Sequence, residues 1–325
     1  MDALRNLITK CDSFKTLKSD FCKDHFSHAY LATNPDSLFL KEFLLFAAAL
    51  AVCPEGGCLE CIYCSRALKA VHADILIYPR EKDTVLSNEI EDIIVSSFVL
   101  PMESKIKAYI INDFDKIQPY LQNKLLKTIE EPSQNTVFFL GATNESKILD
   151  TIKSRCQKIN IDQIVYDDVV AYLEEKGIQK IDAQKAAAIS FLQPLKAESF
   201  VKDAGIFQMF EDVINAVKSL SSSRESLQCI SILSKYKNNY QLLLQMMMIV
   251  FREALSMQNK QRLLLPESKK NDIISVADKF SQTALTFSLD LISEAKTKLE
   301  NFCNFNVVID ELVLSILEVK HRCPK

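Results

Sequence analysis

Short apolar runs alternate with longer amphipathic or apolar stretches through the first half of the chain. Five short runs predict strands: residues 28–33, 73–78, 107–113, 135–143 and 157–161. The first four are mostly apolar, as in buried strands, and the fifth is more polar. The stretches around them predict helices over 1–27, 37–52, 87–100 and 116–132. Ser87 is expected to cap the third of these helices, and Pro132 to end the fourth. Strands of this kind alternating with helices are typical of a parallel sheet covered on both faces, so we predict an α/β domain over 1–161.

The strand pattern stops beyond this domain. Residues 162–205 predict short helices, bounded by Gly177 and Pro194. From 206 to 325 the pattern is helical, and the serine-rich stretch 219–226 is interpreted as a turn between helices. We therefore predict three domains: 1–161, 162–205 and 206–325.

Composition and charge restrict the possible partners. A net charge of −3 gives no global basic surface, so contact with nucleic acid would have to be local or indirect. The longest apolar run, residues 43–53, has 11 residues, which is short of the ~20 that a membrane span needs. The N-terminal segment alternates charged and apolar residues and has no signal-peptide core. We expect a cytoplasmic protein without a membrane partner.

Glycine is scarce, and this bears on nucleotide binding. The chain has only five glycines: Gly56, Gly57, Gly141, Gly177 and Gly205. A loop that cradles phosphate turns its backbone N–H groups inward through conformations that glycine adopts without steric cost. None of the five belongs to a G-x-x-x-x-G-K-[ST] motif, so the sequence excludes a standard phosphate-binding loop.

Four of the ten cysteines crowd into the segment "CPEGGCLECIYC": Cys53, Cys58, Cys61 and Cys64. Two gaps of two residues, preceded by a Pro-Glu-Gly-Gly turn, let the four sulfurs converge on a tetrahedral ion. Four thiolates without histidine favour a closed, structural zinc site over a catalytic zinc, which needs an open position. Four buried cysteines without a metal are the alternative.

Several further segments occur together with this cluster in an order shared with a known family. They are "HAYL", "VHAD", "KAYIINDFDKI", "NKLLKTIEEPSQNTVFFLGATN" and "IKSRC". In this order they resemble the AAA+ subunits of bacterial DNA polymerase III clamp loaders, most densely over residues 26–161. Residues 301–317 resemble the last helices of the collar domain of that family. The resemblance implies an AAA+ type parallel five-stranded sheet with an inserted zinc module (53–64), a small helical lid over 162–205 and an all-helical collar over 206–325.

The resemblance also shows where a nucleotide site would lie and how it has changed. Active members of the family have a Walker A loop after "HAYL". This chain has Asn34, Ser37 and Phe39 in that loop, and Leu40 stands where the phosphate-binding lysine would be. No glycine remains to turn backbone N–H groups toward a phosphate. The resemblance therefore implies that ATP is not bound here.

The second nucleotide motif has changed as well. The Walker B acidic pair of active relatives reads Asn112-Asp113 in this chain. An amide at Asn112 cannot serve as a carboxylate toward Mg²⁺, and Asp113 is one methylene shorter than the glutamate that usually polarises the attacking water. The chain is therefore expected not to be an ATPase on its own.

Other polar residues near strand ends are interpreted as structural. Asp113 and Asp115 read as solvated acids. Thr143 and Asn144 fall at the sensor-1 position of the family and are expected to pack or to cap. His72, in "VHAD", is expected to cap a turn rather than to bind a metal.

Ser154-Arg155-Cys156 matches the family motif whose arginine reaches the ATP of a neighbouring subunit. A guanidinium suits that role because it is planar, permanently charged and able to contact two phosphate oxygens at once. A surface arginine that pairs with a helix C-terminus is the structural alternative. Cys156 is interpreted as a small, packed apolar residue.

Taken as a whole, the resemblance implies a subunit of the replicative clamp loader that does not hydrolyse ATP. It would join tau/gamma-type ATPase subunits and the delta subunit within the DNA polymerase III holoenzyme, and supply Arg155 in trans. Through that assembly it would act on the sliding clamp and on primer–template DNA. A structural zinc ion would be its cofactor, with no ATP bound by this chain.

Three alternatives stay open. One is an ATP-hydrolysing subunit of the tau/gamma type, against which the glycine count speaks. Another is a zinc-ribbon nucleic-acid-binding protein on a degenerate AAA+ scaffold, although the residues between the cysteines carry no positive charge. A third is a degenerate AAA+ paralogue that assembles with something other than a polymerase.

Overall fold

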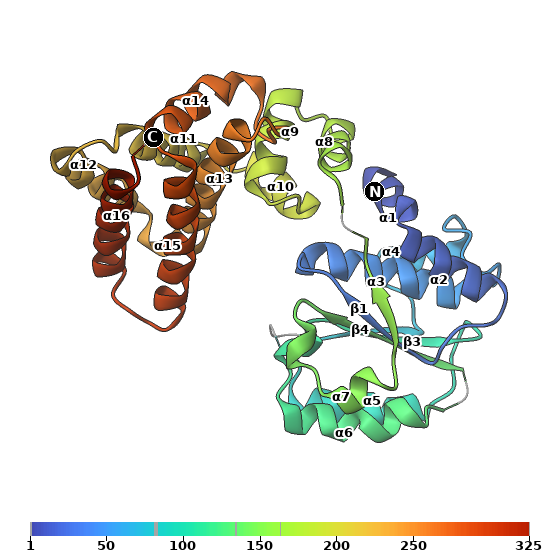
Figure 1. Ribbon diagram of the computed structural model, residues 1–325. Helices are drawn as coiled ribbons and strands as arrows, with labels where there is room; N and C mark the ends of the chain where they lie inside the picture. Colours follow the sequence, from blue (N-terminus) through green and yellow to red (C-terminus); the bar gives the residue numbers. More distant parts are fainter. Residues whose placement is uncertain (1, 81–83, 134, 163, 325) are drawn as a thin grey trace. The chain divides into compact units, whose positions relative to one another are not determined.

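The computed structural model describes residues 2–80, 84–133, 135–162 and 164–324. The chain forms two compact units, Met1–Gln163 and Ile164–Lys325. The first unit is α/β and the second is helical (Figure 1). None of the helices in the described ranges is long and apolar enough to cross a membrane.

The first unit is built on a five-stranded parallel sheet. Its strands are β1 (Ala29–Thr33), β2 (Ile75–Tyr78), β3 (Lys107–Ile111), β4 (Thr136–Ala142) and β5 (Gln157–Asn160). They lie in the order β2-β3-β4-β1-β5. All five predicted strands are confirmed. Because β3, β4 and β1 are neighbours in the middle of the sheet, the residues that follow them meet at one edge.

Helices cover both faces of this sheet, as predicted (Figure 1). One face carries α1 (Asp2–Lys10), α2 (Asp12–Cys22), α3 (Ser37–Val52) and α4 (Ile62–Leu68). The other carries α5 (Ser87–Ser97), α6 (Pro119–Glu130) and α7 (Asp150–Lys153). Helix α3 contacts the sheet as well as α2 and α4. This burial on nearly all sides explains why its sequence is apolar without interruption from Phe43 to Val52.

Two details of the predicted helices are wrong. Residues 1–27 form two helices because the chain turns at Cys11, whose backbone is extended. Helix α5 begins at Ser87, but Ser87 does not cap it. Instead the Glu89 carboxylate accepts a hydrogen bond from the backbone N–H of Leu86 at 2.9 Å. A glutamate at the third helical position, reaching back to the residue before the helix, satisfies this N-terminus.

The described part of the second unit contains helices and no strand. Its helices are α8 (Tyr166–Glu175), α9 (Lys180–Ile189), α10 (Pro194–Val201), α11 (Ala204–Ser219), α12 (Ser223–Leu233), α13 (Tyr240–Gln258), α14 (Lys270–Lys279), α15 (Gln282–Glu300) and α16 (Phe305–Arg322). The serine-rich stretch 219–226 holds the turn between α11 and α12, as predicted. A hydrophobic core joins residues from α9 to α16. The division of this unit into 162–205 and 206–325 stays a prediction.

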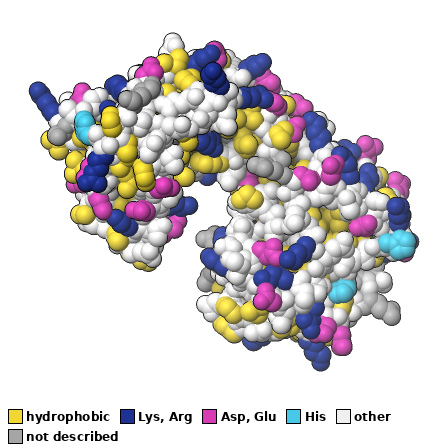
Figure 2. All heavy atoms as spheres, viewed as in Figure 1, with side chains coloured by type: hydrophobic (Ala, Val, Ile, Leu, Met, Phe, Trp, Pro, Cys, Tyr) yellow, Lys and Arg dark blue, Asp and Glu magenta, His cyan; other side chains and the backbone are white. Residues whose placement is uncertain are grey.

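Charge is mixed over the molecular surface. On the face that Figure 2 shows, lysines and arginines are interspersed with aspartates and glutamates over both units. No broad basic patch stands out among the coloured residues of this face. The pattern agrees with the net charge of −3.

Candidate functional site

The position of the phosphate-binding lysine is part of the hydrophobic core. Leu40 is 2% exposed, and Phe39 beside it is fully buried. Leu40 lies over strand β4, where a Cβ added to Gly141 would be 3.3 Å from Leu40 Cδ2. Ser37, the first residue of α3, is exposed instead. The side chain at position 40 therefore faces the sheet and is closed off from solvent.

A carboxylate of the chain itself accepts hydrogen bonds from the first backbone N–H groups of helix α3. Asp36 is buried, and its Oδ1 accepts hydrogen bonds from the backbone N–H groups of Leu38 at 3.0 Å and Phe39 at 3.1 Å. Asn34 accepts from the N–H of Asp36 at 2.8 Å and so fixes the turn before it. N-terminal helix amides are the groups that bind phosphate in nucleotide folds. Here they hold the chain's own anion.

The end of strand β3 is also closed by internal contacts. Asp113 adopts a left-handed conformation with φ of 52° and pairs with Lys116 at 3.0 Å. Asp115 is only 6% exposed and accepts hydrogen bonds from Thr143 N at 3.1 Å and Thr143 Oγ1 at 3.0 Å. The prediction that both acids are solvated is therefore wrong. Asn112 is buried too.

His72, Thr143 and Asn144, which were predicted to cap or to pack, make local or buried structural contacts. His72 is buried, and its Nδ1 accepts a hydrogen bond from the backbone N–H of Asp74 at 3.1 Å. Asn144 accepts from the N–H of Ser146 at 3.0 Å and caps the short helix Glu145–Lys147. Thr143 is engaged by the buried Asp115, a contact that the sequence interpretation missed.

Arg155 follows α7 and is held at two points. Its Nη1 donates to the carbonyl of Thr151 at 3.0 Å, and its Nη2 donates to Glu130 Oε1 at 3.0 Å. The side chain is 33% exposed. The hydrogen bond to Glu130 raises the pKa of Arg155, so the guanidinium stays charged. Arg155 therefore pairs with the C-terminal end of a helix, as in the structural alternative to a trans role. Its side chain is still partly at the surface.

The residues on either side of Arg155 fix the backbone. Ser154 Oγ donates to the Thr151 carbonyl at 3.1 Å and closes the end of α7. Cys156 is buried in the core of the first unit, and burial raises the pKa of its thiol to about 12. It is therefore an unreactive packed residue, as interpreted from the sequence.

The four clustered cysteines converge in space. Cys53 ends α3, Cys58 lies in the following loop, and Cys61 and Cys64 belong to the start of α4. All four sulfurs lie within 4.8 Å of one another, with separations of 3.7 Å between Cys53 and Cys58 and 3.8 Å between Cys53 and Cys61. Zinc–sulfur bonds of about 2.3 Å place the corners of a tetrahedron about 3.8 Å apart. The sulfurs are thus spaced for one zinc ion.

Backbone amides support this cluster. The N–H groups of Cys58, Cys61 and Cys64 point at sulfurs of the preceding ligands, at 3.4, 3.3 and 3.4 Å. Burial alone would raise the pKa of the Cys53 thiol. Hydrogen bonds from backbone N–H groups of the loop outweigh this effect and lower the pKa to about 7. Such amide bonds stabilise thiolates, which are the form that binds metal.

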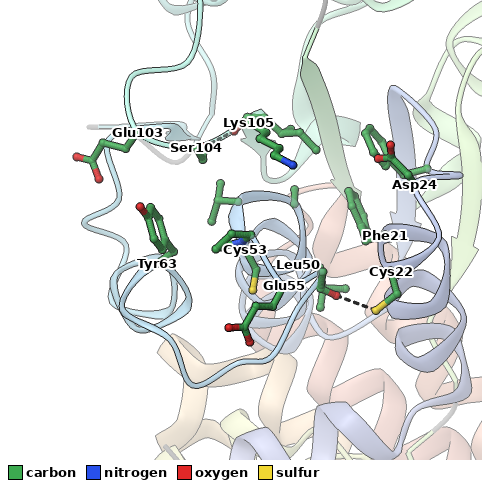
Figure 3. A pocket seen from close by; sticks show the side chains of 16 residues that line it. Phe21, Cys22, Asp24, Leu50, Cys53, Glu55, Tyr63, Glu103, Ser104 and Lys105 are labelled. Carbon is green, nitrogen blue, oxygen red and sulfur yellow. Dashed lines mark hydrogen bonds between the residues drawn. The ribbon is translucent and has the colours of Figure 1, made fainter.

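A surface cavity of about 740 Å³ lies beside the cysteine loop (Figure 3). Cys22, at the end of α2, lines it and donates its S–H to the carbonyl of Gly56 at 3.1 Å. A Cβ at Gly56 would lie 3.0 Å from Cys22 Cα, so α2 and the loop are closely packed. Cys22 stands outside the group of four sulfurs. Its contact, which the sequence did not reveal, anchors the loop.

Comparison with known proteins places this geometry in context. A family model described as "DNA polymerase III, delta subunit" matches residues 10–165. The chain is similar to DNA polymerase III subunit delta' of Bacillus subtilis, with 25% identity over 315 residues that cover 94% of this chain and 95% of the relative. It is also similar to DNA polymerase III subunit tau of B. subtilis, with 30% identity over 168 residues, 50% of this chain and 29% of the relative.

A solved structure is also similar, at lower identity. It is a DNA polymerase III gamma subunit-related protein of Thermotoga maritima, with a TM-score of 0.44 and 15% identity. The match covers 95% of this chain and 100% of that chain.

Proposed function

Since this chain belongs to the DNA polymerase III delta-prime family of clamp-loader subunits, we propose that it supplies an arginine to the ATP of a neighbouring subunit and binds no ATP itself. One observation carries the second half of this proposal. The position of the phosphate-binding lysine is Leu40, which is 2% exposed and faces Gly141 in the sheet. Asp36 adds a negative charge at the helix terminus where a phosphate would otherwise bind.

Arg155 is the residue proposed to act in trans. It is charged, partly exposed and held by its surroundings, which suits a contact with phosphate oxygens on another chain. An arginine supplied in this way is worth about 10³ to 10⁵ in rate in well-studied nucleotide hydrolases. The rate effect would appear in the neighbour's ATPase activity, since this chain has no nucleotide site of its own in the proposal.

The proposed partners follow from the family. We propose that the chain assembles with tau/gamma-type ATPase subunits and with a delta subunit, and that 206–325 forms its part of a collar. Similarity to a delta' relative along 94% of this chain supports an assembly role for both units. The sliding clamp and primer–template DNA would be reached through that assembly.

We further propose that Cys53, Cys58, Cys61 and Cys64 hold a structural zinc ion. Their sulfur spacing and the amide bonds to them support this assignment. When bound, zinc would fix the loop between α3 and α4. Two basic residues already have acidic partners here, Arg5 with Glu60 of the loop and Arg66 of α4 with Glu103, which favours a structural role over nucleic-acid binding.

Alanine at Arg155 tests the proposed function. In a clamp loader reconstituted with its ATPase and delta subunits, R155A should assemble normally by size-exclusion chromatography. Its DNA-stimulated ATPase rate should fall by at least about 10²-fold at the affected site. An unchanged rate in a fully assembled complex would reject Arg155 as the trans arginine.

A further inference from the structure

Among the residues that the structure describes, one side chain bonds to Arg155, and it comes from a different element. Glu130 is the last residue of α6, and its Oε1 accepts a hydrogen bond from Arg155 Nη2 at 3.0 Å. The second contact, from Nη1 to the Thr151 carbonyl, is local to α7. Together the two bonds tie the guanidinium to two elements that follow different strands of the sheet. The plane and direction of the guanidinium are therefore set within this chain, before any neighbour is present.

The stem of the arginine is also enclosed. Its Nε is buried, whereas the side chain as a whole is 33% exposed. The exposed part of the side chain therefore does not include Nε. An arginine on an unrestrained stem would sample many rotamers, and each would place the charge elsewhere.

The contact with Glu130 leaves capacity for a phosphate. A guanidinium has five N–H donors, and the two hydrogen bonds above use one on each Nη atom. One N–H on each Nη therefore remains for phosphate oxygens, without loss of Glu130 or of the Thr151 carbonyl. Exposed ion pairs of this kind contribute little to stability. Orientation is the effect that the geometry offers.

We infer that Glu130 is a positioning residue for Arg155, which it holds in the orientation that meets the ATP of the adjacent subunit. This inference rests on the proposed function of Arg155. Glu130 touches neither ATP nor the reacting atoms in it. It acts only through the guanidinium. Small displacements of a catalytic group have large effects on rate, which is why such support is worthwhile.

The test uses the reconstituted clamp loader with primed DNA and ATP. Glu130→Ala should lower kcat by about tenfold. The effect should be smaller than that of removing the arginine, because Arg155 without its partner still samples the orientation that contacts ATP. The KM for ATP should be nearly unchanged, since ground-state binding belongs to the neighbour. Glu130→Gln keeps an oxygen acceptor and should recover part of the lost rate. Glu131→Ala is the matched control, since no hydrogen bond to Arg155 is described for this exposed neighbour.

Combining substitutions separates a positioning role from a general structural one. The double variant Glu130→Ala with Arg155→Ala should be no slower than Arg155→Ala alone. A further loss in the double variant would show that Glu130 acts by another route and would overturn the inference. An equal or faster rate for Glu130→Ala, with Arg155→Ala slow, would also overturn it while the proposed function stands. An unchanged rate for Arg155→Ala would instead overturn the proposed function itself.

Discussion

Leu40 of α3 and Gly141 of β4 are in contact within the core of the α/β unit. A Cβ at Gly141 would lie 3.3 Å from Leu40 Cδ2 and 2.8 Å from Leu44 Cδ1, so helix and strand approach as closely as glycine allows. In the proposed function, this packing makes a core position of the residue that would bind phosphate in an active relative. A cation could not be restored there without burying it.

We predict that Leu40→Lys destabilises the protein and does not create nucleotide binding. A lysine ammonium at a site that is 2% exposed would lose most of its hydration, at a cost of about 3 to 5 kcal/mol. Urea unfolding followed by circular dichroism measures the change. Leu38→Lys is the control, because Leu38 is 51% exposed and its substitution should stay within about 0.5 kcal/mol. Equal stability of the two variants would contradict the packing argument.

The cysteine cluster predicts one zinc ion per chain. Cys58→Ser should abolish retention of zinc after dialysis, measured by inductively coupled plasma mass spectrometry. It should also lower Tm by roughly 5 °C or more, because the loop between α3 and α4 loses its cross-link. Cys22→Ser should keep the metal, since the Cys22 thiol bonds to the Gly56 carbonyl and is not one of the four converging sulfurs. Full zinc content in Cys58→Ser would argue against this ligand set.

The charge of the Glu198 carboxylate stabilises the second unit. Burial alone would raise the pKa of Glu198, but hydrogen bonds from Lys202 and Tyr172 and the nearby Lys176 lower it to about 2. A lowered pKa gives stability that is present above the unfolded-state pKa of about 4.3 and is lost as pH falls toward the folded value.

We therefore predict that Glu198→Gln lowers Tm at pH 6, and that its difference from the wild type shrinks steadily as the pH is taken to 3. Thermal unfolding across this range measures both quantities. Glu174→Gln, at an exposed position of α8, should follow the wild-type curve throughout. A difference that stayed constant with pH would mean that the Glu198 charge is not responsible.

Much of the first unit could be predicted from the sequence because its central strands β1, β3 and β4 are buried on both faces. Short apolar runs of this kind are typical of buried strands. All five strands of the structure fall within the predicted ranges. Helix 37–52 was predicted with the bounds that the structure has, because α3 is mostly apolar and begins after an Asn-Pro-Asp turn.

Polar contacts between distant elements could not be predicted in the same way. Gln122 reads as a surface residue of an amphipathic helix, yet it is fully buried and bonds to the backbone of Ile117, Lys147 and Leu149. Sequence spacing carries no information on such pairs, since each depends on how loops after different strands meet. The Glu130–Arg155 pair is of this type as well.

Asp36 is a different case, because its role had a local signal. An aspartate directly before an apolar helix is a preferred N-cap, and the structure places its carboxylate on the first amides of α3. The missing glycines of this segment are evident in the sequence, but the Asp36 carboxylate on the helix amides was not predicted.

A titration of the isolated, zinc-loaded chain with a fluorescent ATP analogue and Mg²⁺ tests most directly whether this nucleotide fold has no nucleotide site. A tau/gamma-type ATPase subunit serves as the positive control. The account predicts no saturable binding up to about 1 mM, which means a binding free energy weaker than about −4 kcal/mol. Micromolar binding would contradict it, because the segment around Asp36 and Leu40 would then cradle phosphate despite its buried leucine and its own carboxylate.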